Sequence, residues 1–276
     1  MKNEIFAARA ALHMWEEPCI SGKEGSGAVF FTGCPLRCVF CQNREIALGS
    51  QGYPMTTETL SGTFLHLQKE GANNINLVTP TQYVPEIREA LLLAKKAGLT
   101  VPVVYNTGSY ELPETIRSLS GFVDIFLPDF KYCDPVLSEA YSNAADYAEV
   151  AEAAIDEMVE ITGGPEFDER GMMLRGTIIR HMVLPGHTKD SMAVLRRVYE
   201  RYGDRIYISI MNQYTPMPGI EDKFPELGRR VTKREYNRVV DFALELGITQ
   251  AFIQEGNAAK ESFIPAFDGS GIPMLH

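Results

Sequence analysis

Seven short segments of this chain, most of them apolar on both faces, alternate with longer amphipathic segments. A strand that is apolar on both faces must be covered on both sides, as are the strands of a parallel sheet flanked by helices. The alternation therefore predicts an α/β fold built from right-handed βαβ units. The predicted strands are 27–32, 74–78, 102–106, 123–127, 177–184, 205–211 and 249–254. The predicted helices are 56–70, 83–97, 111–119, 134–161 (in two pieces), 188–202 and 232–246.

Polar residues follow nearly every predicted strand, at positions from which they can converge on one mouth of the sheet. In barrel enzymes the loops at the carboxyl ends of the strands build the active site. We therefore favour a TIM-type barrel, complete or partial, over an open doubly wound sheet. The polar stretches are 34–41, 79–81, 106–109, 129–131, 184–187 and 212–214.

No internal repeat, linker or low-complexity tract interrupts the 276 residues, which favours one domain over 1–276. Within it we expect an N-terminal extension at 1–24, a core barrel at 25–212, and a C-terminal loop with the last βα elements at 213–276. The stretch 213–231 contains three prolines and two glycines, and it is a candidate lid or partner-binding loop.

The formal net charge of -10 argues against a surface for nucleic acid or anionic membrane, because both need a basic footprint. No apolar run approaches the roughly 18 residues that span a bilayer. The N-terminal stretch lacks the uninterrupted apolar core of a signal peptide. We therefore expect a cytoplasmic protein, in a compartment where disulfides are rare.

Three of the five cysteines, Cys34, Cys38 and Cys41, lie within eight positions. A helix would place these thiols on one face and bury them in the core, although Gly33 and Pro35 favour a loop. A structural zinc site normally uses four protein ligands in two pairs, so a three-cysteine zinc site would need a histidine from elsewhere in the chain. A [4Fe–4S] cluster has four irons, and three thiolates leave one iron open to a non-protein ligand.

The segment CPLRCVFC matches the CxxxCxxC signature of the radical S-adenosylmethionine (radical SAM) superfamily, including the aromatic Phe40 before the last cysteine. The resemblance extends over most of the chain. GSGAVFFTGCPLRCVFCQNREIA, DIFLPDFKYCDP and IRHMVLPGH resemble the pyruvate formate-lyase activating-enzyme group. RAALHMWEEPCISG, NINLVTPTQYVP and MNQYTPMP are similar to an activating-enzyme-like subgroup.

The resemblance implies a partial (β/α)6 barrel with one [4Fe–4S] cluster on Cys34, Cys38 and Cys41. It implies that S-adenosylmethionine (SAM) binds the open iron and is reductively cleaved to methionine and a 5′-deoxyadenosyl radical for hydrogen abstraction. The implied substrate is a protein or peptide, as for glycyl-radical activases, and the implied partner is a low-potential electron donor such as flavodoxin or ferredoxin. The alternative hypotheses are a radical SAM enzyme with a small-molecule or other protein substrate and a non-catalytic metal-binding protein.

The resemblance also assigns residues to the SAM site, and it places Phe40 at the cofactor. Thr79 and Thr81 stand where many members have a GGE-like stretch, so their carbonyls and hydroxyls are expected to accept hydrogen bonds from the SAM amino group. The alternative is a strand end capped by threonines. Asn106 is expected at the SAM ribose or carboxylate, with an Asx turn as the alternative.

Asp129 and Lys131 match the DxK motif of the activating enzymes. Alternation on a strand end points both side chains to one side. Lys131 is expected toward the SAM carboxylate and Asp129 toward the ammonium or a nearby cation, whereas a solvated surface pair is the alternative. Arg180 and His181 alternate on one strand, so one of the two faces inward.

His187 follows a Leu-Pro-Gly turn that the resemblance places near the SAM ribose, and a structural histidine is the alternative. Gln213 and Tyr214 end the next strand and are expected at adenine or substrate. Cys19 and Cys133 are isolated, so the chain lacks the cysteines of an inserted ferredoxin-like module and should hold a single cluster. Cys19 is expected to be a buried small apolar residue.

Overall fold

The computed structural model describes residues 4–49, 51–254 and 265–273, and these residues form one continuous sheet with strand order β10-β9-β8-β6-β5-β4-β2-β1-β3. From β10 to β2 along this order the strands are parallel, which confirms the α/β fold. The parallel strands are β2 (Ser26–Phe31), β4 (Ile75–Val78), β5 (Val103–Thr107), β6 (Ile125–Pro128), β8 (Met173–Met182), β9 (Tyr207–Met211) and β10 (Ala251–Ile253). They correspond to the seven predicted strands. Because β10 and β3 do not pair within the described residues, the barrel is partial.

Antiparallel strands that the sequence pattern does not predict extend the sheet. β1 (Ile5–His13) pairs with β2, with Ala7 opposite Phe31, and β3 (Tyr53–Met55) pairs with β1. The short β7 (Glu166–Phe167) pairs with β8. Alanine has a low strand propensity, so the alanine-rich β1 owes its conformation to pairing with β2 more than to its own sequence.

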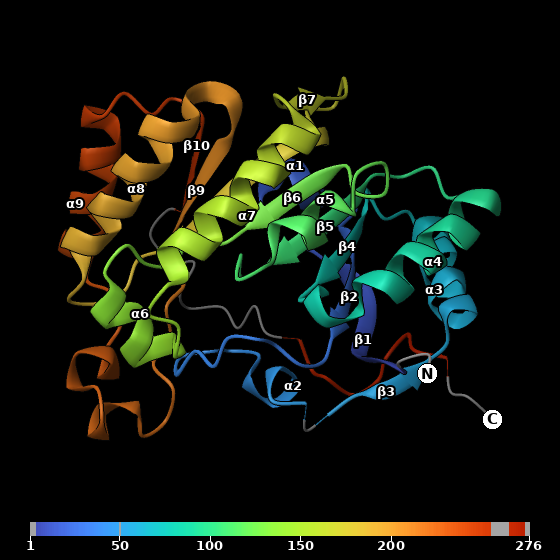
Figure 1. Cartoon of the computed structure of the whole chain (residues 1–276), viewed down its shortest axis with the longest axis horizontal. Coiled ribbons are helices and arrows are strands. Elements are labelled where there is room, and N and C mark those ends of the chain that lie inside the picture. The colour runs from blue at the N-terminus through green and yellow to red at the C-terminus, as the bar shows by residue number, and fades with distance from the viewer. Residues whose placement is uncertain (1–3, 50, 255–264, 274–276) are drawn as a thin grey trace.

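Helices cover one face of the parallel strands, as Figure 1 shows. They share a buried core with the strand residues that face them. These helices are α3 (Thr57–Lys69), α4 (Val84–Lys96), α5 (Pro113–Arg117), α6 (Pro135–Ser142), α7 (Tyr147–Thr162), α8 (Thr188–Tyr202) and α9 (Lys233–Glu245). They confirm the predicted helices, including the two pieces of 134–161. The hydroxyl of Thr56 caps α3, and a capping box of Thr232 and Glu235 begins α9.

A short helix after β1 packs against the opposite face of the sheet. This helix, α1 (Pro18–Ser21), carries Cys19 and Ile20 into a second apolar cluster, separate from the helix-covered core. Its strand members are Val104, Ile125, Leu127, Met173 and Ile178. The side-chain amide of Asn74 donates to the carbonyl of Ile20 over 2.8 Å, so a backbone acceptor that would otherwise be buried without a partner is satisfied. We call residues 18–21 the plug, because they fill the inside of the barrel near the starts of its strands.

The stretch 213–231 is a packed connection that contains two 3-10 turns, η3 (Ile220–Asp222) and η4 (Pro225–Gly228). Tyr214 is buried, and its hydroxyl donates to the carbonyl of Leu227 over 2.7 Å. This bond ties the two ends of the stretch together. A role as lid or partner-binding loop stays a prediction.

The remaining short elements are α2 (Arg44–Ala47), η1 (Thr81–Tyr83) and η2 (Gly203–Arg205). The division of the chain into extension, core and C-terminal elements stays a prediction, and residues 255–264 and 274–276 of the last part lie outside the described residues. No helix in the described parts of the chain is long and apolar enough to cross a bilayer.

Replacing Ile20 by alanine tests the plug. The side chain is fully buried, so the cavity left by Ile20→Ala should lower the free energy of unfolding by about 2–5 kcal/mol. The measurement is the midpoint of urea-induced unfolding. Leu112, which is 62% exposed, gives the control: Leu112→Ala should change stability by less than about 0.5 kcal/mol. Equal midpoints for the two variants would contradict the packing described for the plug.

Candidate active site

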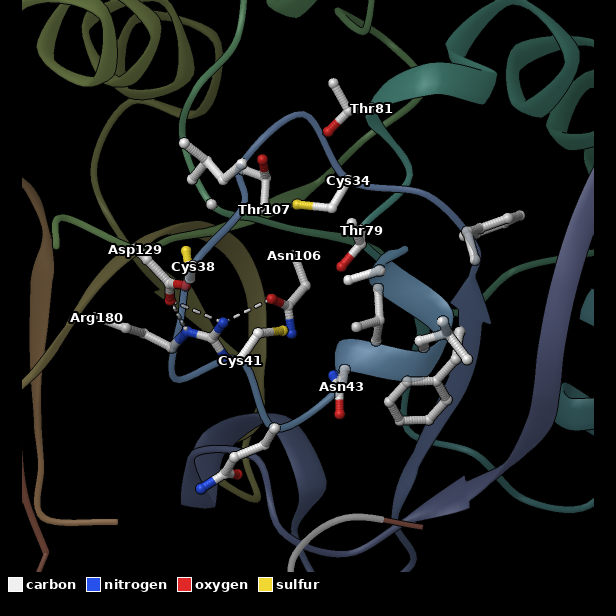
Figure 2. Close-up of a pocket in the computed structure, with 18 of the residues that line it drawn as sticks. Cys34, Cys38, Cys41, Asn43, Thr79, Thr81, Asn106, Thr107, Asp129 and Arg180 are labelled. Atoms are coloured by element: carbon white, nitrogen blue, oxygen red, sulfur yellow. Dashed lines mark hydrogen bonds and ion pairs between the residues drawn. The ribbon is translucent and has the colours of Figure 1, made fainter. Parts of the chain in front are cut away.

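The three clustered cysteines lie on one loop that leaves β2 at the carboxyl end of the sheet. Gly33 begins this loop with a φ of 88°, a left-handed conformation that glycine adopts without strain. Residues 34–43 are not helical and lead into α2, so the interpretation of the cysteines as a helical stripe is wrong. Cys34, Cys38 and Cys41 all line one cavity, and Figure 2 shows their side chains around one end of it.

The donor set fits a [4Fe–4S] cluster. All five cysteines are free thiols, and neither Cys19, in the plug, nor Cys133 lines the cavity. The described cavity residues therefore offer three thiols to a four-iron cluster, which leaves one iron for a non-protein ligand. Burial raises the pKa of Cys34 and of Cys41 to about 11. Loading with metal must therefore displace thiol protons.

A single zinc ion was the competing metal hypothesis. Among the described residues of the cavity, His13 is the histidine available to complete a three-cysteine site, and its ring packs edge-on against Phe30 with 5.9 Å between centroids. No three His, Cys, Asp or Glu side chains in the described residues are arranged to hold one ion. The zinc hypothesis thus finds no ready ligand set within these residues.

The cavity also gathers most of the residues predicted to surround SAM. These residues stand at or after the ends of β4, β5, β6 and β9 and on β8, on the same side of the sheet as the cysteine loop. They are Thr79, Thr81, Asn106, Asp129, Lys131, Arg180 and Gln213. The structure therefore brings them together beside the cysteines, while their individual contacts with SAM stay predictions.

A partly buried ion network centred on Arg180 forms part of the cavity wall. Its guanidinium lies 2.9 Å from Asp129 and 3.2 Å from Glu16, and it donates to the side-chain oxygen of Asn106 over 2.6 Å. The ammonium of Lys131 contacts the second oxygen of Asp129 at 2.6 Å. Burial acts to raise the pKa of Asp129, but the charges of Arg180 and Lys131 outweigh burial and lower that pKa. Asp129 is therefore an ionised bridge between two cations.

Two glutamates that the sequence analysis gave no role join this network. Glu16 accepts a hydrogen bond from the side-chain amide of Asn76 over 3.0 Å. Glu17 is also buried, and one of its carboxylate oxygens has no hydrogen-bond partner among the described residues. Burial raises the pKa of both glutamates, and the charge of Arg180 opposes that rise. A Glu-Glu pair in a sequence ordinarily indicates a solvated surface, so no local signal could have placed them here.

Thr79 adopts an unusual backbone conformation at the edge of the cavity. Its φ of 56° lies in the left-handed region, which β-branched residues rarely enter. Its backbone N–H donates to the carbonyl of Asn106 over 2.9 Å, which ties the end of β4 to β5. Backbone strain of this kind is typical of functional sites, where the surrounding structure holds it in place.

Phe40 lies behind the cysteine loop, outside the main cavity. It is buried, and its ring packs edge-on against Tyr132, Tyr141 and Tyr214. It lines a smaller neighbouring pocket together with Gln213. The aromatic residue of the cysteine motif therefore supports the loop and does not line the wall that carries the three thiols.

The two histidines of IIRHMVLPGH make structural contacts. Nδ1 of His181 lies 2.8 Å from the carbonyl oxygen of Phe130 and its side chain is buried, so Arg180 is the member of the pair that faces the cavity. Nε2 of His187 lies 2.8 Å from the hydroxyl of Tyr141, and His187 does not line the cavity. The structural alternative named for His187 fits these contacts, and its predicted place near the ribose gains no support.

Comparison with known proteins identifies the family. A family model described as the radical SAM superfamily matches residues 28–199, more than half of the chain, and the matched region includes the cysteine loop. The chain belongs to the radical SAM superfamily. Enzymes of this superfamily use a [4Fe–4S] cluster and SAM, which are therefore its cofactors.

An uncharacterized protein of Methanocaldococcus jannaschii is 25% identical to this radical SAM chain over 252 residues, which cover 87% of the chain and 67% of the relative. A solved radical SAM methyltransferase from Sphaerobacter thermophilus is similar, with a TM-score of 0.56, 14% identity, and coverage of 83% of this chain and 66% of that one. SuiB of Streptococcus suis, solved with its precursor peptide SuiA, gives a TM-score of 0.54, 14% identity, and coverage of 83% and 48%. This chain thus spans less than two thirds of these solved structures, and at such identities the likeness shows the fold alone.

Replacing Glu17 by glutamine tests the buried acidic pair. Because burial raises the pKa of Glu17 in the folded state, its ionised form costs stability above that pKa, and the cost disappears as the pH falls toward the ordinary value of 4.5. We expect Glu17→Gln to be more stable than the wild type near pH 8 and the two to converge near pH 4–5, measured by urea unfolding. The exposed Glu245→Gln is the control for removal of one carboxylate. A stability difference that does not change with pH would contradict the assignment.

Proposed function

We propose that this radical SAM chain is an activating-enzyme-like oxidoreductase that abstracts hydrogen from a protein or peptide. The observation that supports it most directly is a three-thiol loop at one end of a cavity whose wall also carries an exposed aromatic residue. That residue is Trp15, the one tryptophan of the chain, and it is 52% exposed. An exposed aromatic next to a reaction site is typical of a surface that meets a macromolecule.

When bound, the cluster supplies one electron to the sulfonium of SAM, which releases methionine and a 5′-deoxyadenosyl radical. The residues of this chain bind and orient SAM. Lys131 and Asp129 stand on the wall beside the thiols, and their mutual ion pair fixes the position of both charged groups. Arg180 holds Asp129 from the other side, so the charges do not reorganise when SAM enters.

The rim of the cavity favours a peptide segment over a small metabolite. Trp15 and Pro265 both line the cavity, and Trp15 is 52% exposed. An apolar rim of this kind suits an extended segment of a partner protein, such as the glycine loop of a glycyl-radical enzyme. A small-molecule substrate would leave the apolar rim without a function.

The electron donor is proposed to be an acidic carrier such as a flavodoxin or a ferredoxin. A separate groove is lined by two of the cluster cysteines, Cys38 and Cys41, and by the exposed Arg37 and Arg44. No acidic residue is among the described residues that line this groove. In a chain of net charge -10, two arginines beside the cluster thiols offer an acidic carrier local charge complementarity.

Cysteine replacements test the cofactor assignment. Replacing Cys34, Cys38 or Cys41 by alanine leaves the cluster with two thiolates, so iron should be lost and SAM cleavage abolished. Cys19→Ala and Cys133→Ala remove no proposed ligand, so both variants should retain their iron and their SAM cleavage. The lost packing should cost about 1 kcal/mol of stability. The measurements are iron content, the brown absorbance, and the yield of 5′-deoxyadenosine after anaerobic reduction. If Cys19→Ala or Cys133→Ala also lost its iron, the protein would supply a fourth ligand and leave no open iron for SAM.

Electron paramagnetic resonance tests the substrate class. The reduced enzyme, incubated with SAM and each glycyl-radical enzyme encoded by its host, should produce the doublet of a glycyl radical on one of them. The control is the same mixture with Cys38→Ala in place of the wild type. Cleavage of SAM without a glycyl radical on any partner would contradict the activating-enzyme assignment and leave a small-molecule or different protein substrate.

A further inference from the structure

Glu111 is a buried carboxylate outside the Arg180 network. It lies in the loop between β5 and α5 and is 3% exposed. One of its oxygens, Oε1, accepts hydrogen bonds from Thr81 at 2.7 Å, from Thr107 at 2.7 Å and from Tyr105 at 3.1 Å. The other, Oε2, is buried and has no partner among the described residues. Burying a carboxylate in this way costs stability, so its position calls for a functional reason.

The three hydroxyls that contact Glu111 differ in what they offer to the cavity. A hydroxyl has one proton, so a threonine that donates to Glu111 can only accept from a third group. Thr81 lines the cavity next to Cys34, and Figure 2 shows both side chains there. Thr107 also lines the cavity, but it is only 3% exposed, and its oxygen already accepts from the backbone N–H of Ser109 at 3.2 Å, whereas Thr81 is partly exposed. Tyr105 is fully buried and does not line the cavity. Thr81 is therefore the acceptor that Glu111 directs toward the cavity.

The cavity needs such an acceptor on this side. Arg180 and Lys131 are positive and lie with Asp129 on the wall formed by β6 and β8. The acceptor oxygens of Asp129, Glu16 and Asn106 near that wall are already engaged by these two cations, so the hydroxyl of Thr81, beside Cys34, is the better placed acceptor for an amino group. Residues 78–81 contain no acidic residue, and Glu111 places a carboxylate behind Thr81 from the loop after β5.

We propose that Glu111 is a positioning residue, which orients the hydroxyl of Thr81 as an acceptor for the α-amino group of SAM. This inference rests on the proposed function, because it assumes that SAM occupies the cavity. Because the hydroxyl of Thr81 donates its proton to Glu111, its oxygen is polarised and accepts more strongly. The carboxylate itself stays buried behind it. A buried donor that loses its acceptor is left unsatisfied at a cost in free energy, so loss of this arrangement should be measurable in binding.

The test compares two ligands, SAM and the SAM analogue in which hydrogen replaces the α-amino group, by anaerobic calorimetry on the cluster-loaded protein. The quantity is the ratio of their dissociation constants in each variant. Coordination of the amino group to iron contributes to this ratio in all variants, so a change in the ratio reports the protein contacts of that group. We expect Glu111→Gln and Thr81→Val to reduce the preference for SAM by roughly ten- to a hundredfold. Affinity for the analogue should stay within about twofold of the wild type.

Two further variants separate positioning from structural support. Tyr105→Phe removes a hydrogen bond to the same oxygen of Glu111 but no atom that lines the cavity, so it should keep the wild-type ratio. Thr81→Ser retains the hydroxyl, so it should also retain the wild-type ratio of dissociation constants. An unchanged ratio of dissociation constants in Thr81→Val would overturn the inference. So would an equal loss of affinity for both ligands in Thr81→Val and Tyr105→Phe. If the wild type binds neither ligand, the proposed function fails instead. If it binds both equally, only the inference fails.

Discussion

The guanidinium of Arg180 is the partly buried charge around which the inside of this barrel is organised. A buried cation is tolerated only when carboxylates and hydrogen-bond acceptors surround it. Arg180 meets this requirement with Asp129 just after β6, Asn106 from β5 and Glu16 from the segment after β1. Segments that are 51, 74 and 164 residues from Arg180 in sequence are therefore tied to one point.

This network divides the barrel into two parts with different chemistry. Near the starts of the strands the plug packs Cys19 and Ile20 into an apolar cluster of strand residues. Beyond the network, the carboxyl ends of the strands carry charged and hydroxyl groups beside three thiols. The apolar end stabilises the fold, and the polar end is free to bind a charged cofactor. The network itself keeps the charges of the wall fixed, which is the condition for electrostatic preorganisation.

The sequence was sufficient to predict the parallel strands, the helices and the loop that holds Cys34, Cys38 and Cys41, because each depends on local periodicity or on close spacing. β1 could not be predicted, since its conformation depends on pairing with β2. The contacts of Glu16 could not be predicted either, because its partner Asn76 lies 60 residues away. The choice between Arg180 and His181 depends on which face of β8 meets the cavity, a matter of register that one strand cannot reveal by itself. The position of Glu111 behind Thr81 likewise depends on the mutual placement of two loops.

Mössbauer spectroscopy of protein loaded with iron-57 tests most directly the central claim that three thiolates leave one iron open to SAM. Spectra of the oxidised cluster are recorded without SAM and with SAM in excess. We expect SAM to change the isomer shift and quadrupole splitting of one of about four irons, as its coordination number rises, and to leave the others as they were. A spectrum in which no iron responds to SAM, or in which every iron has a protein ligand, would contradict the account.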